Sequence, residues 1–383
     1  MPPLEIHAHH HATRAPVVVR CDAGIIAAVE PDHSAAVAAR DDVWIAPALW
    51  DLQMNGYAGV DFQRAGQTTT SLLTATRALR EAGCTRYLLT LITNEWRALT
   101  TQLRELKALR DASPELRAAI VGWHIEGPFM SNQPGFVGAH NPAFMRDPTP
   151  AAIHELRAIT GRDPLLLTVA PERAGVLAAI ELAVSLGIKI SLGHTNASLE
   201  LIHAAVRAGA TAFTHLGNGC PKDLDRHDNI LWRVFDTPGL TVGIIPDRIH
   251  VSPTLFRLMH RVLPAEKLYY TTDAMSAAGA PPGRYTIGEL ELEVGADQIV
   301  RLPGKTNFAG SALRPHEGIF RAAQMLGRPW QEVWDHGARI PAQFIGFDAQ
   351  IAAGAPADFC VLRFKPGTDL PDMQTYANGG PAA

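Results

Sequence analysis

The sequence predicts an α/β protein with a closed barrel of eight parallel strands, the (β/α)8 or TIM-type barrel, and a small β-sandwich domain built from both chain ends. Eight short apolar runs with strand character follow one another from Val43 to Ala274, and Ala/Leu-rich helical segments separate most of them. Crossovers of this length suit parallel neighbours and are too long for hairpins. At 383 residues the chain is long enough for such a barrel and a small second domain.

The repeating unit is clearest in residues 189–218, KISLGHTNASLELIHAAVRAGATAFTHLGN. Two apolar runs end at His194 and His215, and the segment between them has helical spacing, with Ser198 as N-cap and Gly209 as the stop. The two imidazoles should therefore lie at the same end of adjacent parallel strands, which is the end of a barrel that carries its chemistry. A lone histidine in an apolar segment is more often a hydrogen-bonded core residue, but the matched pair favours metal ligands.

The two chain ends have a different character. Residues 1–46 consist of short strands, and residues 349–383 supply two more strands around a Gly/Pro turn, with nothing ordered expected after Pro371. We expect these two ends to form the small β domain and residues 47–348 to form the barrel domain.

Several segments of the barrel domain have their own signals. The run WIAPALWDLQMNG reads as one strand that places Asp51, Gln53 and Asn55 on the same face. Residues 281–300 predict a β-rich excursion, and QEVWDHGARIPAQFIG predicts one amphipathic helix that ends at Gly346.

Composition limits the kind of protein. Hydrophobic residues make up 47% of the chain and charged residues 19%, with a net charge of -4, which is typical of soluble globular proteins. The sequence lacks a basic cluster, an apolar run of about 18 to 20 residues and a secretory leader, so we expect no nucleic-acid partner, no membrane span and a cytoplasmic location. The four cysteines are scattered without a C-x-x-C pair, which favours reduced thiols.

Polar side chains at the predicted strand ends define a candidate site. Glu126, His194 and His215 form a set of one carboxylate and two imidazoles, which with water in a fourth position is how catalytic zinc is held. Asp273 ends the last strand, where a carboxylate can take a proton from water and pass it to a leaving group. A helix N-cap at Asp273 would have the same sequence pattern.

Four loops at the same end have the composition of binding segments. All four carry polar groups and three of them also carry glycine, and one of these three, GPFMSNQPGFVGAHNP, is long enough to act as a lid. A solvated charged loop would look the same as the segment HLGNGCPKDLDRHDN. The residues of interest in these loops are His140, Asn218, Gly219, Arg226, Arg248, His250 and the turn from Phe308 to Ser311.

The order and spacing of several motifs resemble the N-acetylglucosamine-6-phosphate deacetylase family of the amidohydrolase superfamily. The motifs are PALWDLQMNGYAGVDF, HIEGPF followed by GAHNP, TVAPE, SLGHTNAS, THLGN, DRIH, TTDAM and AGSAL, between about residues 45 and 360. Most members of the superfamily carry a His-x-His pair on the first strand. Gln53 and Asn55 stand there in this chain, as in single-metal members of the deacetylase family.

The resemblance implies deacetylation of N-acetyl-D-glucosamine 6-phosphate to D-glucosamine 6-phosphate and acetate, by attack of metal-activated water. It implies one divalent metal, most often zinc, held by Glu126, His194 and His215, with Asp273 as the acid/base. Gln53 and Asn55 would orient groups around the metal. Residues that match the family's substrate contacts are Ala139, His140, Asn218, Gly219, Arg226, His250, Phe308, Ala309 and Gly310.

The family also recognises the 6-phosphate through an arginine and a histidine, the arginine reaching across from a second subunit. Arg226 and His250 fall at these positions, so the resemblance implies a phosphosugar substrate and a homodimer.

Three departures from the family pattern concern the substrate. Gly217 and Cys220 replace a bulky residue and a methionine, and Phe136 and Val137 stand where a lysine is usual. Arg248 replaces a glycine, and its guanidinium would either strengthen phosphate binding as a bidentate donor or fill space meant for another part of the sugar. They leave open a different N-acetylated amino sugar, phosphorylated or not. A dihydroorotase-like cyclic amidase should bring a first-strand histidine pair, and a non-catalytic sugar-binding barrel has no need for the full metal and acid/base set.

Overall fold

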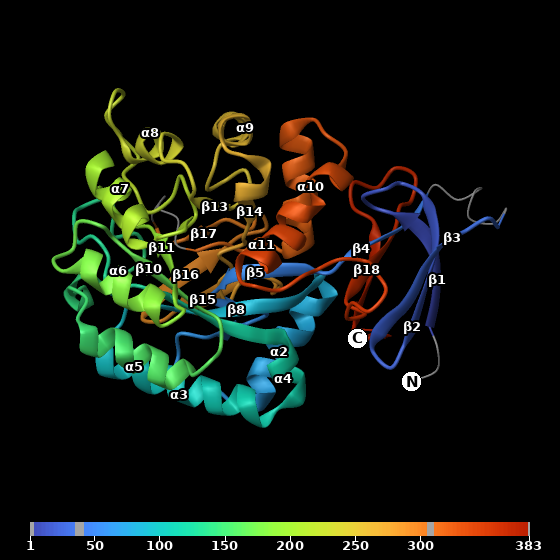
Figure 1. The fold of residues 1–383 in the computed structure, drawn as a ribbon, viewed down its shortest axis with the longest axis horizontal. Helices are drawn as coiled ribbons and strands as arrows, with labels where there is room; N and C mark the ends of the chain where they lie inside the picture. The colour runs from blue at the N-terminus through green and yellow to red at the C-terminus, as the bar shows by residue number, and fades with distance from the viewer. Residues whose placement is uncertain (1–3, 35–41, 305–309, 382–383) are drawn as a thin grey trace.

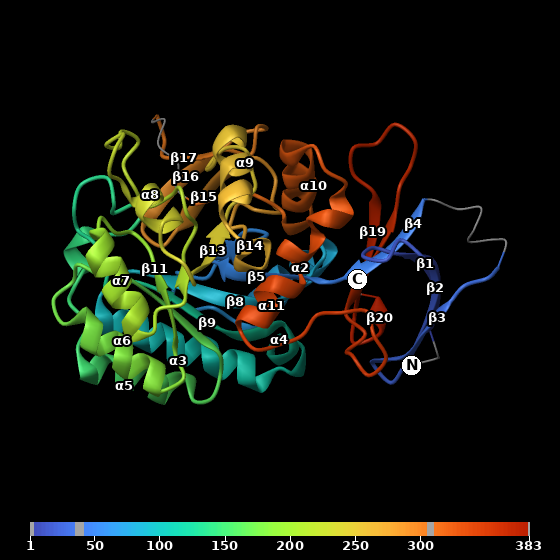
Figure 2. The ribbon, with the colours of Figure 1, turned by 45° about the horizontal axis from the view of Figure 1, so that its top comes forward.

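The computed structural model describes residues 4–34, 42–304 and 310–381, and it places a parallel barrel beside a smaller sheet (Figures 1 and 2). Within these residues, eight strands pair in parallel in chain order, which confirms the predicted barrel. The strands are β5 (Leu49–Met54), β8 (Cys84–Ile92), β9 (Ile120–Glu126), β10 (Leu165–Val169), β11 (Lys189–Leu192), β12 (Ala212–Phe213), β13 (Thr241–Ile244) and β14 (Leu268–Tyr270).

Helices surround the barrel, and their ends follow the local sequence. Thr68 and Ser71 form a reciprocal capping box at the start of α2, with distances of 3.1 and 3.0 Å. Ser198 caps α7, and Gly209 ends it in a left-handed conformation, as predicted. The helices are α2 (Thr69–Glu81), α3 (Trp96–Ala112), α4 (Pro114–Ala119), α5 (Pro150–Thr160), α6 (Val176–Ser185), α7 (Leu199–Ala208), α8 (Ile230–Phe235), α9 (Pro253–Val262), α10 (Pro315–Leu326) and α11 (Arg339–Phe344). In the described part of the chain, each helix is too short or too polar to cross a membrane.

A buried carboxylate supports the closure of the barrel between β5 and β14. Asn55 N donates to Ala274 O at 2.8 Å across this seam. The Asp51 carboxylate accepts hydrogen bonds from Thr271 Oγ1 at 2.5 Å and from the N and Oγ1 atoms of Thr272 at 3.0 and 2.6 Å. Burial raises the pKa of Asp51, and these hydrogen bonds favour its ionised form. The end of β5 is thereby held against the last strand of the barrel.

The two chain ends pair into one sheet, which confirms the predicted small β unit. Among the described residues its strand order is β20-β19-β18-β4-β1-β2-β3, with β4 parallel to β1 and antiparallel to β18. The edge strand β3 and the turn before it contact the segment that precedes β18, because Ile26 N donates to Ala355 O and Ala357 N donates to Gly24 O, both at 2.9 Å. The strands are β1 (Leu4–His10), β2 (Pro16–Asp22), β3 (Ile25–Pro31), β4 (Val43–Pro47), β18 (Phe359–Arg363), β19 (Asp372–Ala377) and β20 (Gly380–Pro381).

The predicted β-rich excursion is also present, as an antiparallel sheet of β15 (Gly283–Ile287), β16 (Leu290–Val294) and β17 (Val300–Arg301). Ile287 of this sheet packs in one apolar cluster with Ile92, at the end of β8, and with Ala139. The excursion therefore covers part of the end of the barrel at which β8 finishes.

Two predicted elements are wrong in their extent. The WIAPALW run is two strands, because residues 43–47 pair with β18 in the small sheet and only residues from Leu49 onward enter the barrel. The helix expected to end at Gly346 is broken into η3 (Trp330–Glu332), η4 (Trp334–His336) and α11. The break falls at Gly337, which packs so tightly that a Cβ there would lie 2.6 Å from Ile319 Cδ1.

The chain after Pro371 is ordered, contrary to the prediction. β19 pairs antiparallel with β18, and Tyr376 stacks on Phe359 with ring centroids 4.9 Å apart. The prediction also placed one strand on each side of the preceding Gly/Pro turn. Residues 349–358 instead form turns and bends, so of the two predicted strands only the second, β18, is present.

Candidate metal centre and active site

The candidate metal ligands and acid/base lie at the carboxyl ends of four barrel strands. Glu126 is the last residue of β9, and His194, His215 and Asp273 follow β11, β12 and β14 within three residues. The last three have φ of 48°, 30° and 52°, in the left-handed region that residues with a Cβ rarely adopt. Each such residue costs about 1–2 kcal/mol. Strain repeated at one end of the barrel is typical of a functional site.

Three ligand atoms converge with the spacing of a metal site. Glu126 Oε1 lies 2.8 Å from His215 Nε2 and 3.4 Å from His194 Nε2, and the two Nε2 atoms are 3.2 Å apart. In a tetrahedral zinc site with bonds of about 2.0–2.1 Å, neighbouring ligand atoms lie about 3.3 Å apart. The three residues are at most 5% exposed. Their donor atoms therefore fit a divalent metal.

The protonation of these groups also suits metal binding. His194 Nδ1 lies 2.8 Å from the Phe136 carbonyl, so Nδ1 donates its proton there and the lone pair of Nε2 faces Glu126. Burial raises the pKa of Glu126, but the contacts of its carboxylate with His194 and His215 outweigh this effect and hold the pKa well below its ordinary value. The carboxylate is thus available as an anionic ligand.

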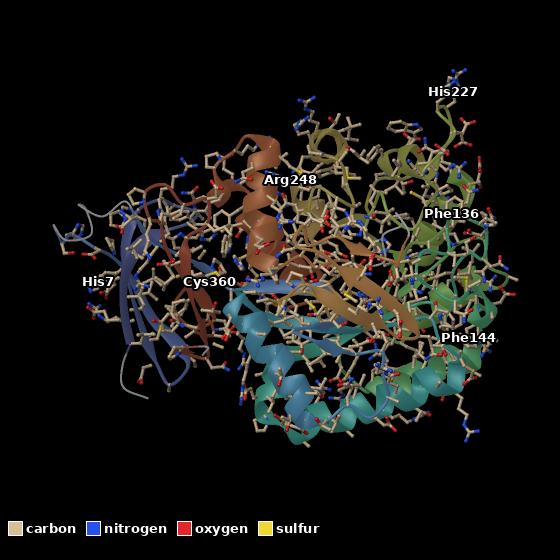
Figure 3. All side chains as sticks on the ribbon, turned by 180° about the vertical axis from the view of Figure 1, so that it is seen from behind. His7, Phe136, Phe144, His227, Arg248 and Cys360 are labelled. Carbon is tan, nitrogen blue, oxygen red and sulfur yellow. The ribbon has the colours of Figure 1, made fainter. Side chains whose placement is uncertain are left out.

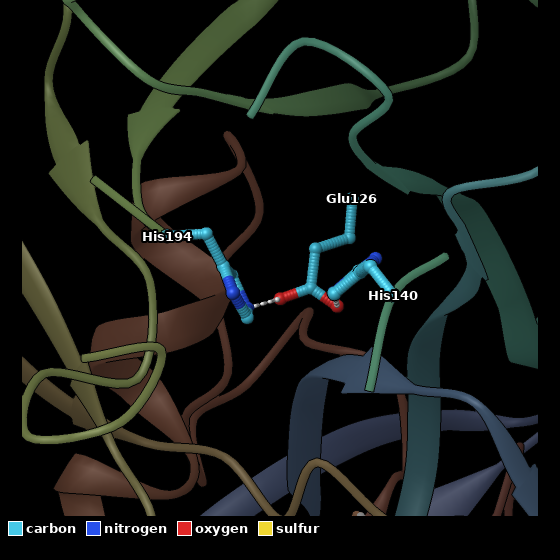
Figure 4. A group of neighbouring side chains, drawn as sticks. All are labelled: Glu126, His140 and His194. Atoms are coloured by element: carbon cyan, nitrogen blue, oxygen red, sulfur yellow. Dashed lines mark ion pairs between the residues drawn. The ribbon is translucent and has the colours of Figure 1, made fainter. Parts of the chain in front are cut away.

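His140 is a third imidazole beside the same carboxylate (Figure 4). Its Nε2 lies 3.6 Å from Glu126 Oε2, and the ligand atoms of His140, Glu126 and His194 all lie within 4.8 Å of one another. Burial lowers the pKa of His140 to about 3, so the ring is neutral. Thr93 N donates to Nδ1 at 3.3 Å, which places the ring proton on Nε2. His140 is accordingly a hydrogen-bond donor toward the cavity and a poorer metal ligand than His215.

Two amide side chains from β5 and its end orient the two carboxylates. Gln53 Nε2 donates to Glu126 Oε1 at 2.9 Å, and Asn55 Nδ2 donates to Asp273 Oδ1 at 2.7 Å. Burial, followed by the negative charge of Glu126, raises the pKa of Asp273 to about 7. A carboxyl group with this pKa can accept and return a proton near neutral pH.

A cavity of about 740 Å³ opens onto these groups and brings together most of the residues expected to contact substrate. Ala139, His140, Asn218, Gly219, His250 and Gly310 line it with Asn55, Glu126, His194, His215 and Asp273. His250 Nδ1 lies 2.6 Å from Asp247 Oδ2, which fixes the ring.

The two predicted arginines lie outside this lining. Arg226 is exposed and its Nε donates to His227 Nε2 at 3.0 Å, while Arg248 is exposed and hydrogen-bonds Gln324 Oε1. The predicted contacts Phe308 and Ala309 fall outside the described residues. Lys222, which is not among the predicted site residues, also lines the cavity. Its place in the loop after His215 is the sequence signal that points to it.

Curated relatives name the family. N-acetylglucosamine-6-phosphate deacetylase of Danio rerio is 33% identical over 330 residues, covering 83% of this chain and 80% of the relative. The chain belongs to the N-acetylglucosamine-6-phosphate deacetylase family. N-acetylgalactosamine-6-phosphate deacetylase of Escherichia coli O157:H7 is 28% identical over 333 residues, covering 87% of this chain and 86% of that protein. No protein-family model matches the sequence.

Solved structures of the deacetylase family share the fold. The Mycobacterium smegmatis N-acetyl-D-glucosamine-6-phosphate deacetylase, solved as a mutant in complex with N-acetyl-D-glucosamine-6-phosphate, superposes with a TM-score of 0.85 at 29% identity over 96% of this chain and 94% of that chain. The Pasteurella multocida N-acetylglucosamine-6-phosphate deacetylase gives a TM-score of 0.86 at 24% identity, over 99% of both chains, which supports the fold alone.

Proposed function

We propose that this protein deacetylates N-acetyl-D-glucosamine 6-phosphate to D-glucosamine 6-phosphate and acetate. The observation that carries the proposal is the pairing of a buried Glu126, His194 and His215 ligand set with Asp273 in one cavity, in a chain of this family. We further propose that the ligand set holds one zinc ion. When bound, a divalent metal polarises water and the acetamide carbonyl and lowers the pKa of that water.

Asp273 acts as the acid/base in this proposal. It takes a proton from the attacking water as the new C–O bond forms, and it delivers this proton to the sugar nitrogen as the C–N bond breaks. Its pKa of about 7 suits both directions of transfer. The hydrogen bond from Asn55 keeps Oδ1 engaged, so the carboxylate retains one orientation through both steps.

His140 and Gln53 support the same step. His140 presents a protonated Nε2 to the cavity, where it can donate to the acetamide oxygen as negative charge develops there. Gln53 donates to Glu126, which orients this carboxylate among the ligands.

We extend the proposal to the assembly and the location. The homodimer follows from the family resemblance. The cytoplasmic location, and the division into a catalytic domain of residues 47–348 and a small domain of residues 1–46 with 349–383, follow from the sequence pattern. Arg226 supports the dimer because its side chain is exposed and away from the lining of its own cavity, as expected of a residue that serves a neighbouring subunit.

A second candidate function is deacetylation of a different N-acetylated amino sugar. Gly217 and Cys220, which replace larger residues of the family pattern, both line the cavity and so change the wall that meets the sugar. The Escherichia coli relative, an N-acetylgalactosamine-6-phosphate deacetylase, makes the 4-epimer a specific alternative to test.

Acetate release distinguishes these functions. Wild type, Asp273→Asn and a chelated sample are assayed with N-acetylglucosamine 6-phosphate, N-acetylgalactosamine 6-phosphate and free N-acetylglucosamine. The proposal predicts the highest kcat/KM for N-acetylglucosamine 6-phosphate, and loss of turnover in both controls. Asp273→Asn keeps the shape of the side chain and the contact with Asn55. Loss of turnover in this variant would therefore report the loss of proton transfer. If kcat/KM were higher for another of these sugars, that sugar would be the substrate instead of N-acetylglucosamine 6-phosphate. Turnover that survives chelation would contradict the proposed dependence on a metal.

A further inference from the structure

Lys222 is a cation of the substrate cavity that the proposed reaction does not use. Among the described residues that line this cavity, it is the one lysine or arginine. Arg226 and Arg248 lie outside the lining, and Figure 3 shows His227, the neighbour of Arg226, at the outer tip of its loop. Lys222 is thus the cation that a single subunit directs at its own cavity.

The surrounding loops fix the backbone on the N-terminal side of Lys222. Cys220 packs against the main apolar core, and Pro221 lies against Gly135 of the neighbouring loop. A Cβ at Gly135 would lie 2.6 Å from Pro221 Cγ, so this close approach depends on glycine. Leu224, on the other side of Lys222, also lines the cavity.

Lys222 is exposed, and in the described part of the chain no hydrogen bond or ion pair joins its ammonium to another residue. The nearby Asp225 carboxylate is occupied, since it accepts from the backbone N atoms of His227 and Asp228 at 2.7 and 3.0 Å. An ammonium on a flexible four-carbon stem acts as a point charge for phosphate. Lys222 therefore has its charge available for a ligand.

The charges of the cavity come from different parts of the fold. Glu126 and Asp273 place carboxylates at the strand ends, whereas Lys222 places a positive charge in the loop beyond His215. A ligand with an uncharged amide at one end and an anionic group at the other matches this distribution. We propose that Lys222 binds the 6-phosphate of the substrate within the subunit whose cavity it lines, an inference that rests on the proposed function.

Binding and turnover are measured together to test it. Glucosamine 6-phosphate and glucosamine are titrated calorimetrically into metal-loaded wild type, Lys222→Gln, Lys222→Arg and Arg207→Gln, and initial rates are measured with the two N-acetylated sugars. Arg207→Gln removes an exposed charge on α7, outside the cavity, and is the control for net charge.

Lys222→Gln should weaken binding of glucosamine 6-phosphate and raise KM for its N-acetylated form by about 10-fold to 100-fold, because a charge-assisted hydrogen bond is lost. The affinity for glucosamine should change less than about threefold, and so should kcat. Lys222→Arg should recover most of the affinity, and Arg207→Gln should match wild type.

Equal affinity for glucosamine 6-phosphate in Lys222→Gln and wild type would overturn the inference, as would an equal loss for both sugars. Phosphate-dependent binding through Lys222 without hydrolysis of N-acetylglucosamine 6-phosphate would refute the proposed function and keep the role of Lys222. The two proposals are therefore separable in one experiment.

Discussion

Substitution of Gly219 by alanine tests whether His194 depends on the glycines packed against its ring. A Cβ at Gly219 would lie 2.9 Å from Nδ1, 3.0 Å from Cγ and 3.1 Å from Cε1 of His194, and one at Gly138 would lie 2.7 Å from Cε1. Since ordinary carbon contacts begin near 3.4 Å, the ring in Gly219→Ala must move by about 0.5 Å. Metal–ligand distances tolerate only about 0.2 Å. We therefore expect at least a tenfold loss of metal affinity.

The stability cost and the activity cost can be separated with a control. Gly219 has φ of 60°, so alanine there also costs about 1–2 kcal/mol in unfolding free energy from its left-handed backbone. Gly327 has φ of 64°, and no atom lies within 4 Å of a Cβ added there. Gly327→Ala therefore carries the same backbone cost but lacks the close contact that Gly219→Ala makes with the His194 ring. In urea, Gly327→Ala should lose about 1–2 kcal/mol of unfolding free energy, and Gly219→Ala at least as much, because its added Cβ also crowds His194.

Metal content and kcat/KM are the deciding measurements. We expect Gly327→Ala to hold one metal per subunit with full kcat/KM, and Gly219→Ala to lose metal on dialysis, with kcat/KM reduced about tenfold to hundredfold. Full metal content together with kcat/KM within twofold of Gly327→Ala would refute the argument that Gly219 keeps His194 in place.

Three other outcomes are expected. Asp51→Asn should lower the unfolding free energy by about 2–3 kcal/mol in urea titration, because an amide faces the donors at the barrel seam, and a smaller change than 1 kcal/mol would contradict this. Arg248→Gly should be about 1 kcal/mol more stable than Arg248→Ala, because φ at this position is 70°, and equal denaturation midpoints would count against strain there. Burial lowers the pKa of His250, but the hydrogen bond and charge of Asp247 outweigh it and raise the pKa above its ordinary 6.5. The stabilisation by this pair is complete below pH 6.5 and is lost as pH rises through the raised pKa. His250→Gln should therefore cost more unfolding free energy at about pH 6 than at about pH 9. A cost that is independent of pH would show that the pair does not stabilise the fold.

The barrel and the ends of its strands could be predicted because their signals are local. An apolar run that stops at His194, a capped helix and a second run that stops at His215 specify the unit without knowledge of distant contacts. The parallel topology then requires the two imidazoles to meet, and they do so at 3.2 Å. The fold class depends on such periodic signals, which one sequence carries in full.

What the sequence did not reveal depends on pairing at long range. The WIAPALW run divides into β4 and β5 because β4 pairs with β18, more than 300 residues later. β19 also forms by pairing with β18. Hydrophobic periodicity also does not predict the direction in which a side chain in a loop points. Lys222 and Arg226 are cations of the same loop, yet only Lys222 lines the cavity.

The place of β4 in the small sheet bears on the order in which the protein is assembled during synthesis. A single residue, Ala48, separates β4 from the first barrel strand, and the two neighbours of β4 are β1, which is made before it, and β18, which is made about 300 residues later. Domains of most proteins fold from the N-terminus as the chain emerges, whereas this pairing must wait for residue 363. Until then β4 is an open edge, a template for pairing with other chains. We expect ribosome-bound chains that stop at residue 350 to remain protease-sensitive between β4 and β5, although every candidate metal ligand has already been made.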